Sequence, residues 1–139
     1  MSEIEVFETT KNKTNLWLKD VMEELELTDK KKAYSALRGT LHILRDRLMV
    51  EESVNFAAQL PMLLRGLYFE GWRPTHVPLS VRKKADFVHL FDGKLADTFA
   101  MEPEEVIRRV FGVIKKHVSE GEIEDIRRSF PEDLRDLWE

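Results

Sequence analysis

Apolar residues recur along most of this chain at steps of three and four positions, and that spacing places them on one face of an α-helix. No segment of useful length alternates apolar and polar residues with a period of two, so we expect no sheet. The pattern therefore predicts an all-α fold. The clearest apolar faces are Trp17, Val21, Met22 and Leu25 for one helix and Ala33, Leu37, Leu41, Leu44 and Leu48 for the next.

Capping residues and prolines divide this apolar pattern into separate helices. Thr10 or Thr14 is the predicted start of the first helix, because either hydroxyl can accept a hydrogen bond from an amide of a first turn. Thr28 and Asp29 offer the next cap in the same way. Pro61 is predicted to end a third helix and to open a fourth, because the residue before a proline disfavours helical geometry.

Two segments of the chain match each other at a constant offset of 70 residues. Residues 60–68 read LPMLLRGLY and residues 130–138 read FPEDLRDLW. Self-similarity at a fixed offset is the signature of a duplicated structural unit. The sequence therefore predicts two tandem, pseudo-symmetric four-helix repeats that pack into one compact helical domain. The matched pairs are Pro61 and Pro131, Leu64 and Leu134, Arg65 and Arg135, Leu67 and Leu137, and Tyr68 and Trp138.

This repeat divides the chain into four predicted parts. Residues 1–9 form a flexible N-terminal segment, because they are acidic and show no apolar pattern. Residues 10–72 form the first four-helix repeat, and residues 80–139 form the second. Between them, residues 73–79 form a linker in the stretch that is densest in proline.

The second repeat is predicted to follow the plan of the first. Ser80 is the expected cap at its start. The apolar positions Phe87, Phe91 and Leu95 that follow match the first apolar face of the chain. Pro131 is predicted to open the last helix.

Several motifs follow one another in a fixed order: NLWLKDV, LRDRLMVEESVNFAAQLPMLL, RGLYFEGW and HVSEGEIEDIRRSFPEDLRDLW. With these motifs the chain resembles, from about Thr10 to Trp138, the bacterial family designated domain of unknown function (DUF) 2267. The resemblance implies a bacterial, helical, intracellular protein. It implies no activity, and therefore no catalytic or binding residues.

Composition and charge narrow the function classes. The chain is 42% hydrophobic and 35% charged, as expected of a folded globular protein. Its net charge of -4 gives no global basic field that would attract nucleic acid or anionic lipid. The absence of cysteine excludes disulfides and cysteine metal sites. No apolar run is long enough to span a bilayer and the N-terminus lacks an apolar signal region, so we expect a cytoplasmic protein without membrane contact.

The most distinctive candidate surface lies at the end of the fourth helix and the start of the linker. Arg65, Tyr68, Glu70 and Trp72 combine an arginine with aromatic residues, and these residue types dominate protein–protein interfaces. We therefore predict that these four residues bind a protein partner. The structural alternative is that the arginine, matched by Arg135, supports the fold, and that the tryptophan fills the seam between the repeats.

Basic residues follow one side of the second helix. Arg38, His42 and Arg45 are spaced by four and three positions, and Arg108 and Lys115 occupy matching positions in the second repeat. Such a stripe could bind phosphate groups. Nearby acidic residues dilute its charge and no nucleic-acid-binding motif is present, so we favour a solvated face with intrahelical ion pairs over nucleic-acid binding.

Metal and enzyme chemistry have little support in the sequence. Among the four histidines, only His117 with Glu120 has a ligand-like spacing, and we expect both side chains to face solvent. None of the common phosphate-binding, nucleophile or zinc-protease motifs occurs. We therefore expect no metal, no cofactor and no catalytic residues.

These observations favour a protein–protein interaction or regulatory module with an unknown protein partner. A small-molecule sensor that uses a pocket between the repeats is the main alternative, because cavities are common between packed helices. Nucleic-acid binding and enzyme activity are less favoured alternatives. A homodimer is also compatible with the sequence.

Overall fold

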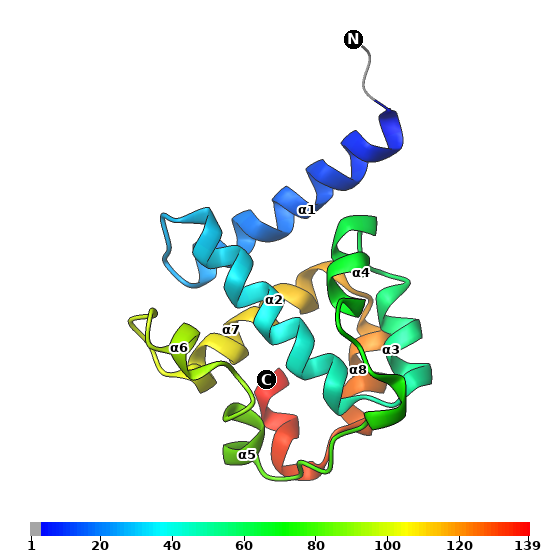
Figure 1. Cartoon of the computed structure of the whole chain (residues 1–139), viewed down its shortest axis with the longest axis vertical. Helices are drawn as coiled ribbons and strands as arrows, with labels where there is room; N and C mark the ends of the chain where they lie inside the picture. Colours follow the sequence, from blue (N-terminus) through cyan, green and yellow to red (C-terminus); the bar gives the residue numbers. More distant parts are fainter. Residues whose placement is uncertain (1–3) are drawn as a thin grey trace.

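The computed structural model describes residues 4–139, and this part of the chain consists of helices joined by turns and loops, with no β-strand (Figure 1). The prediction of an all-α fold is therefore confirmed. The α-helices are α1 (Glu5–Glu24), α2 (Lys30–Arg47), α3 (Val50–Ala57), α4 (Met62–Phe69), α5 (Lys84–Val88), α6 (Gly93–Ala96), α7 (Pro103–His117) and α8 (Glu120–Ser129), and the 3-10 helices are η1 (Pro74–His76) and η2 (Glu132–Trp138).

Helix α1 begins at Glu5, so the predicted start near Thr10 or Thr14 is wrong. Two acidic residues lie in its first turn, where carboxylates interact favourably with the helix dipole. Oγ1 of Thr10 accepts a hydrogen bond from the amide of Leu63 in α4 at 3.0 Å. This hydroxyl therefore joins two helices instead of capping one.

The N-terminal turns of α1 include part of the segment that was predicted to be flexible. Residues 5–9 are helical, and they lie at the top of the molecule in Figure 1. Residues 1–3 lie outside the described part of the chain. The sequence pattern missed these first turns, because they carry no apolar stripe.

The start of the second half also differs from the prediction. Ser80 does not cap a helix, because α5 begins only at Lys84, whose amide donates to Oδ2 of Asp133 at 2.7 Å. The apolar positions that match the first helix of the chain are divided between α5 and α6. The break occurs at Asp92, whose carboxylate accepts a hydrogen bond from the amide of Lys94 and so caps a new helix.

The apolar residues on either side of this break still reach the core. Phe87 and Phe91 are buried, and Leu95 packs against the core while remaining half-buried. The last predicted helix does follow Pro131, but it is the 3-10 helix η2. Spacing therefore predicted which side chains are buried more reliably than it predicted the helices that carry them.

Helix α7 lies at the centre of the core, where it packs against α1, α2, α5 and η2. Phe111 of α7 is fully buried and stacks on Trp138 of η2, with ring centroids 3.9 Å apart and planes inclined by 14°. Trp17 and Val21 bring α1 into the same core. One hydrophobic core therefore joins both halves of the chain.

The segment predicted to link the two repeats is tied to α2. It contains η1, and beyond this turn the amide of Leu79 donates to the carbonyl of Asp46 at 2.8 Å. Nε of Arg47 donates to the carbonyl of Val81 at 2.6 Å. These contacts hold the connecting chain at the C-terminal end of α2. The boundaries of the repeats and the symmetry between them stay predictions.

Replacement of Phe111 by alanine should lower the free energy of unfolding by about 3–5 kcal/mol, because it leaves a cavity at the centre of the core. Urea denaturation followed by far-UV circular dichroism would measure the change. Val54 of α3 is 52% exposed, so Val54→Ala is the control and should change stability by about 0.5 kcal/mol or less. A loss below about 1 kcal/mol for Phe111→Ala would contradict the central position of this ring.

Candidate interaction site

The four residues predicted to bind a partner have different environments, and Tyr68 is the most enclosed. It has no exposed surface. Its hydroxyl shares a hydrogen bond with Oγ of Ser53 at 2.9 Å, and its ring centroid lies 5.2 Å from those of Phe56 and Phe69. Burial also raises the pKa of Tyr68. A side chain in this position supports the surface from below, and partner binding by Tyr68 stays a prediction.

Glu70 and Trp72 lie just beyond the C-terminal end of α4. Glu70 is exposed, and its Oε1 accepts a hydrogen bond from Nη2 of Arg38 at 2.6 Å, which lowers the pKa of Glu70. Trp72 is half-buried, and its ring centroid lies 4.8 Å from that of Phe69. Its Nε1 is buried and has no hydrogen-bond acceptor within residues 4–139. Partner binding by Glu70 and Trp72 stays a prediction.

The predicted basic stripe on α2 faces the C-terminal end of α4. Nε2 of His42 lies 2.8 Å from the carbonyl oxygen of Leu67, and burial lowers the pKa of this histidine. Nη1 of Arg45 donates to the carbonyls of Tyr68 at 3.0 Å and of Glu70 at 2.7 Å. The last carbonyls of a helix have no partner inside the helix, and basic side chains stabilise them. His42 and Arg45 of the stripe are therefore engaged with backbone carbonyls of the protein itself.

The matching basic residues of α7 hold η2 in a similar manner. Nζ of Lys115 donates to the carbonyl of Trp138 at 2.7 Å. Nη1 of Arg108 donates to the carbonyl of Asp136 at 2.7 Å, and bonds from Lys84 and Arg108 lower the pKa of the Asp136 carboxyl group. Arg108 also forms the expected intrahelical pair, because its Nε donates to Oε2 of Glu104 at 3.0 Å. The expectation of intrahelical pairs therefore holds in part, but it missed the contacts with η2, a short helix that needs donors for its carbonyls.

Arg65 supports the fold from the first turn of α4. Its Nε donates to the carbonyl of Ala57 at 3.1 Å and its Nη2 to the carbonyl of Leu60 at 3.2 Å. Arg135 donates from Nε to the carbonyl of Phe130 at 3.0 Å. Each arginine therefore stabilises the end of the helix that precedes its own.

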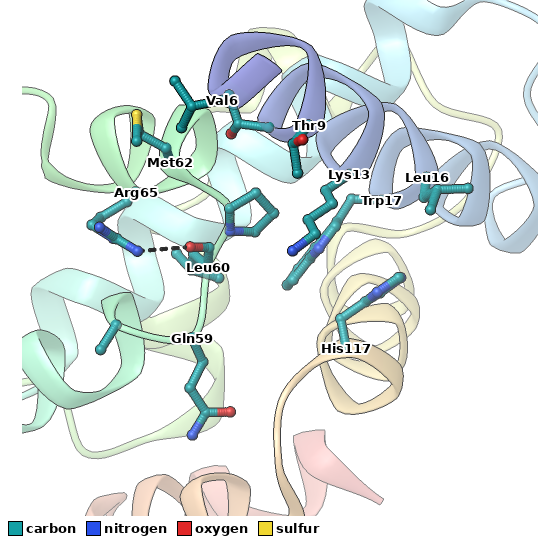
Figure 2. Close-up of a pocket in the computed structure, with 13 residues that line it drawn as sticks. Val6, Thr9, Lys13, Leu16, Trp17, Gln59, Leu60, Met62, Arg65 and His117 are labelled. Carbon is teal, nitrogen blue, oxygen red and sulfur yellow. Dashed lines mark hydrogen bonds between the residues drawn. The ribbon is translucent and has the colours of Figure 1, made fainter.

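A cleft of about 580 Å³ lies between α1, the loop that joins α3 to α4, and the C-terminal end of α7 (Figure 2). Of its lining residues, only Arg65 was among the predicted partner-binding residues. Lys13 and Leu16 also line it. Their sequence positions give no sign of this role, because they lie beside the apolar stripe of α1 and meet the loop only through tertiary packing.

His117 forms one wall of the cleft. Its imidazole stacks on Trp17, with ring centroids 4.6 Å apart and planes inclined by 18°, and its Nε2 lies 2.7 Å from Oδ2 of Asp20. The expectation that His117 faces solvent beside Glu120 is wrong, because α1 packs against the end of α7 and half-buries the ring. Within residues 4–139, no group of three or more acidic, histidine or cysteine side chains could hold a metal ion.

Polar contacts fix the walls of the cleft relative to one another. The side-chain amide of Gln59, in the α3–α4 loop, donates to Oγ of Ser119 at 2.9 Å and accepts from the amide of Ser119 at 2.8 Å. On the opposite side, the hydrogen bond between Thr10 and Leu63 joins α1 to α4. These contacts within the protein hold the walls in place, and a rigid cleft reduces the entropy that binding would cost.

The cleft combines an apolar rim with positive charge. Val6, Leu16 and Met62 are 49%, 57% and 49% exposed. The ionisable side chains among its described lining residues are Lys13, Arg65 and His117, and none of these lining residues is acidic. The chain as a whole carries a net charge of -4, so this local composition is distinctive. Such a surface complements a ligand that has an apolar face and negative charge.

The described residues form a helical protein with a cleft beside its first and fourth helices. The chain belongs to the family described as "Uncharacterized conserved protein (DUF2267)", whose model matches residues 14–137, so the resemblance noted from the motifs is confirmed. A comparison with curated proteins found no match. Among the helices of residues 4–139, none has both the length and the apolar character needed to cross a membrane.

Arg45→Ala should lower the free energy of unfolding by about 2–4 kcal/mol, because it leaves carbonyls at the end of α4 without their buried donor. Arg38→Ala is the matched control on the same helix. Its ion pair with Glu70 is exposed, with side-chain exposures of 44% and 58%, so we expect a loss of about 1 kcal/mol or less. Parallel urea titrations would compare the two variants, and equal losses would mean that Arg45 acts only as a surface charge.

Proposed function

We propose that this chain is a protein–protein interaction module whose cleft between α1 and α4 binds an acidic amphipathic helix of a partner. Such a helix carries an apolar stripe with carboxylates beside it, and helix-in-groove binding is a common mode of peptide recognition. The stripe would cover exposed side chains such as Leu16 and Met62. The carboxylates would pair with Lys13 and Arg65.

The charge of the cleft carries this proposal. Lys13 extends from α1 into the space between α1 and the α3–α4 loop (Figure 2). Within residues 4–139, Arg65 uses two of its five N–H groups on backbone carbonyls, so others can bind a carboxylate. A local positive field attracts acidic partners and repels basic ones, and it therefore contributes specificity.

A small-molecule sensor is a second candidate. The cleft volume of about 580 Å³ lies within the range of pockets that bind small ligands. A small anionic amphiphile would use the same basic groups as a peptide. The exposed rim favours the peptide, because a small molecule would leave Val6 and Met62 in water.

We also propose that the chain consists of two related four-helix halves. The matched contacts of Arg65 and Arg135 with the ends of the preceding helices support this relation. The contacts of Arg45 and Lys115 with the ends of α4 and η2 support it as well. A cytoplasmic location in a bacterium belongs to the same proposal and rests on the family resemblance.

Selection from a displayed library of helical peptides would test the proposed function. The library presents one apolar stripe flanked by acidic, neutral or basic residues, and the full chain is the immobilised target. We expect enrichment of the acidic peptides. Their affinity should fall as salt concentration rises, because salt screens exposed charge pairs.

Lys13→Glu and Lys19→Glu form a matched pair of variants for this experiment. Both lysines are exposed on α1, but only Lys13 lines the cleft. Lys13→Glu should weaken the selected acidic peptides at least about tenfold, or about 1.4 kcal/mol, whereas Lys19→Glu should have little effect. Enrichment of basic peptides, or equal losses in both variants, would contradict the proposal. If no peptide is enriched but decanoate raises the melting temperature, the sensor is the better description.

A further inference from the structure

Helices α3 and α8 pack against one another across the two halves of the chain, and each carries a glutamate on this seam. Glu52 lies in the first turn of α3 and Glu122 in the first turn of α8. The side chain of Glu52 is close enough to that of Glu122 to contribute to the raised pKa of Glu122. Two acidic groups therefore meet where the halves join.

Glu122 is buried to an unusual degree for a carboxyl group. The residue is only 8% exposed, and its Oε2 is buried without a hydrogen-bond donor among the residues that the structure describes. Removing a carboxylate from water without a donor or a cation is strongly unfavourable. The neutral carboxylic acid does not have this penalty, and it has a proton to donate.

The contact between Glu122 and Glu52 requires that proton. Carboxylates only accept hydrogen bonds, so two ionised groups in contact repel one another, whereas a protonated group donates to an ionised partner. Burial, together with the contact to Glu52, raises the pKa of Glu122 to about 8. The folded protein therefore holds the proton at neutral pH.

Among residues 4–139, the charged neighbours that shift the pKa of Glu122 are all acidic. Asp125, on the same helix, adds negative charge. From α4, Tyr68 contributes a neutral hydroxyl that is bonded to Ser53. From η2, the basic side chain of Arg135 is engaged with backbone carbonyls. The negative charge of Glu122 is therefore neutralised by binding a proton.

We propose that Glu52 and Glu122 form a pH-sensitive latch, in which one shared proton closes the seam between α3 and α8. With the proton in place, Glu122 donates a hydrogen bond to Glu52. Without it, two negative charges face each other beside the buried end of Glu122, and the two helices separate locally. Closing the seam therefore takes up a proton, and opening it releases one.

The latch lies beside the cleft. Gln59 follows α3, and its two hydrogen bonds hold Ser119, which is the N-cap of α8. Separation of α3 from α8 would therefore shift the cleft wall that the α3–α4 loop forms. This effect on binding rests on the proposed function, whereas the latch itself does not.

The pKa difference between the folded and unfolded states fixes the direction of the pH dependence. An ordinary glutamate has a pKa of 4.5, whereas Glu122 in the folded chain has a pKa of about 8. Between these two values the folded state binds more protons than the unfolded state. Rising pH therefore lowers the folding equilibrium constant, by up to about tenfold per pH unit, until the folded-state pKa is passed.

Urea unfolding of the full chain from about pH 5 to about pH 9 would test the latch. Wild type is compared with Glu122→Gln and with Glu124→Gln, whose side chain is 53% exposed on the same helix. The ratio of the folding constant of Glu122→Gln to that of wild type should rise by up to about tenfold per pH unit below pH 8. Glu124→Gln should follow wild type. Parallel curves for wild type and Glu122→Gln would overturn the proposal.

Two further measurements need no variant, so they stand even if Glu122→Gln fails to fold. An NMR titration of the side-chain carboxyl carbon should give a midpoint near 8 for Glu122, and a midpoint near 4.5 would overturn the latch. Above the midpoint, amides of α8 should lose hydrogen-exchange protection. Unchanged protection would mean that loss of the proton does not separate α3 from α8, and this would overturn the latch. None of these experiments involves a peptide, so a failed latch and a failed docking site are distinguishable.

Discussion

Backbone carbonyls at the ends of short helices set the constraint on which much of this structure depends. A helix of two turns leaves a large share of its carbonyls without a partner inside the helix. Basic side chains from the longer helices supply the donors, as Arg45 does for α4 and Lys115 for η2. A basic side chain also stabilises the C-terminal end of α1, where Nη1 of Arg109 donates to the carbonyl of Glu24 at 2.7 Å. Basic residues that look like a ligand-binding stripe in sequence are therefore occupied inside the fold.

Much of the fold follows from the sequence because side-chain spacing reports burial directly. Leu37, Leu41 and Leu44 are all fully buried, as their helical spacing predicts. Helix boundaries were less accessible, because they depend on local competition for backbone hydrogen bonds. Asp92 caps a new helix within an apolar pattern that reads as continuous. In α1, the hydroxyl of Thr10 bonds another helix, which a cap assigned from residue type alone does not anticipate.

The candidate site was less predictable, because it exists only after distant segments pack together. Arg65 was identified from residue type, and it does line the cleft. Tyr68 was grouped with it, but tertiary packing with Phe56 encloses that ring, which has no exposed surface. Lys13 belongs to a helix that carries two other exposed lysines, Lys11 and Lys19. Lys13 differs from them because it lines the cleft together with the α3–α4 loop, and the local sequence gives no sign of this proximity.

The packing of α1 against α7 has a consequence for synthesis on the ribosome. Helix α1 emerges before α7, but its Asp20 binds His117, which lies 97 positions later in the chain. The ring of Trp17 likewise gains its stacked neighbour only when α7 has been made. Contacts of such long sequence separation form late. Part of the apolar face of α1 therefore stays exposed to solvent until α7 has been synthesised. For this chain, the vulnerable period is the interval between the emergence of α1 and that of α7, when a chaperone that shields apolar helices would have the most effect.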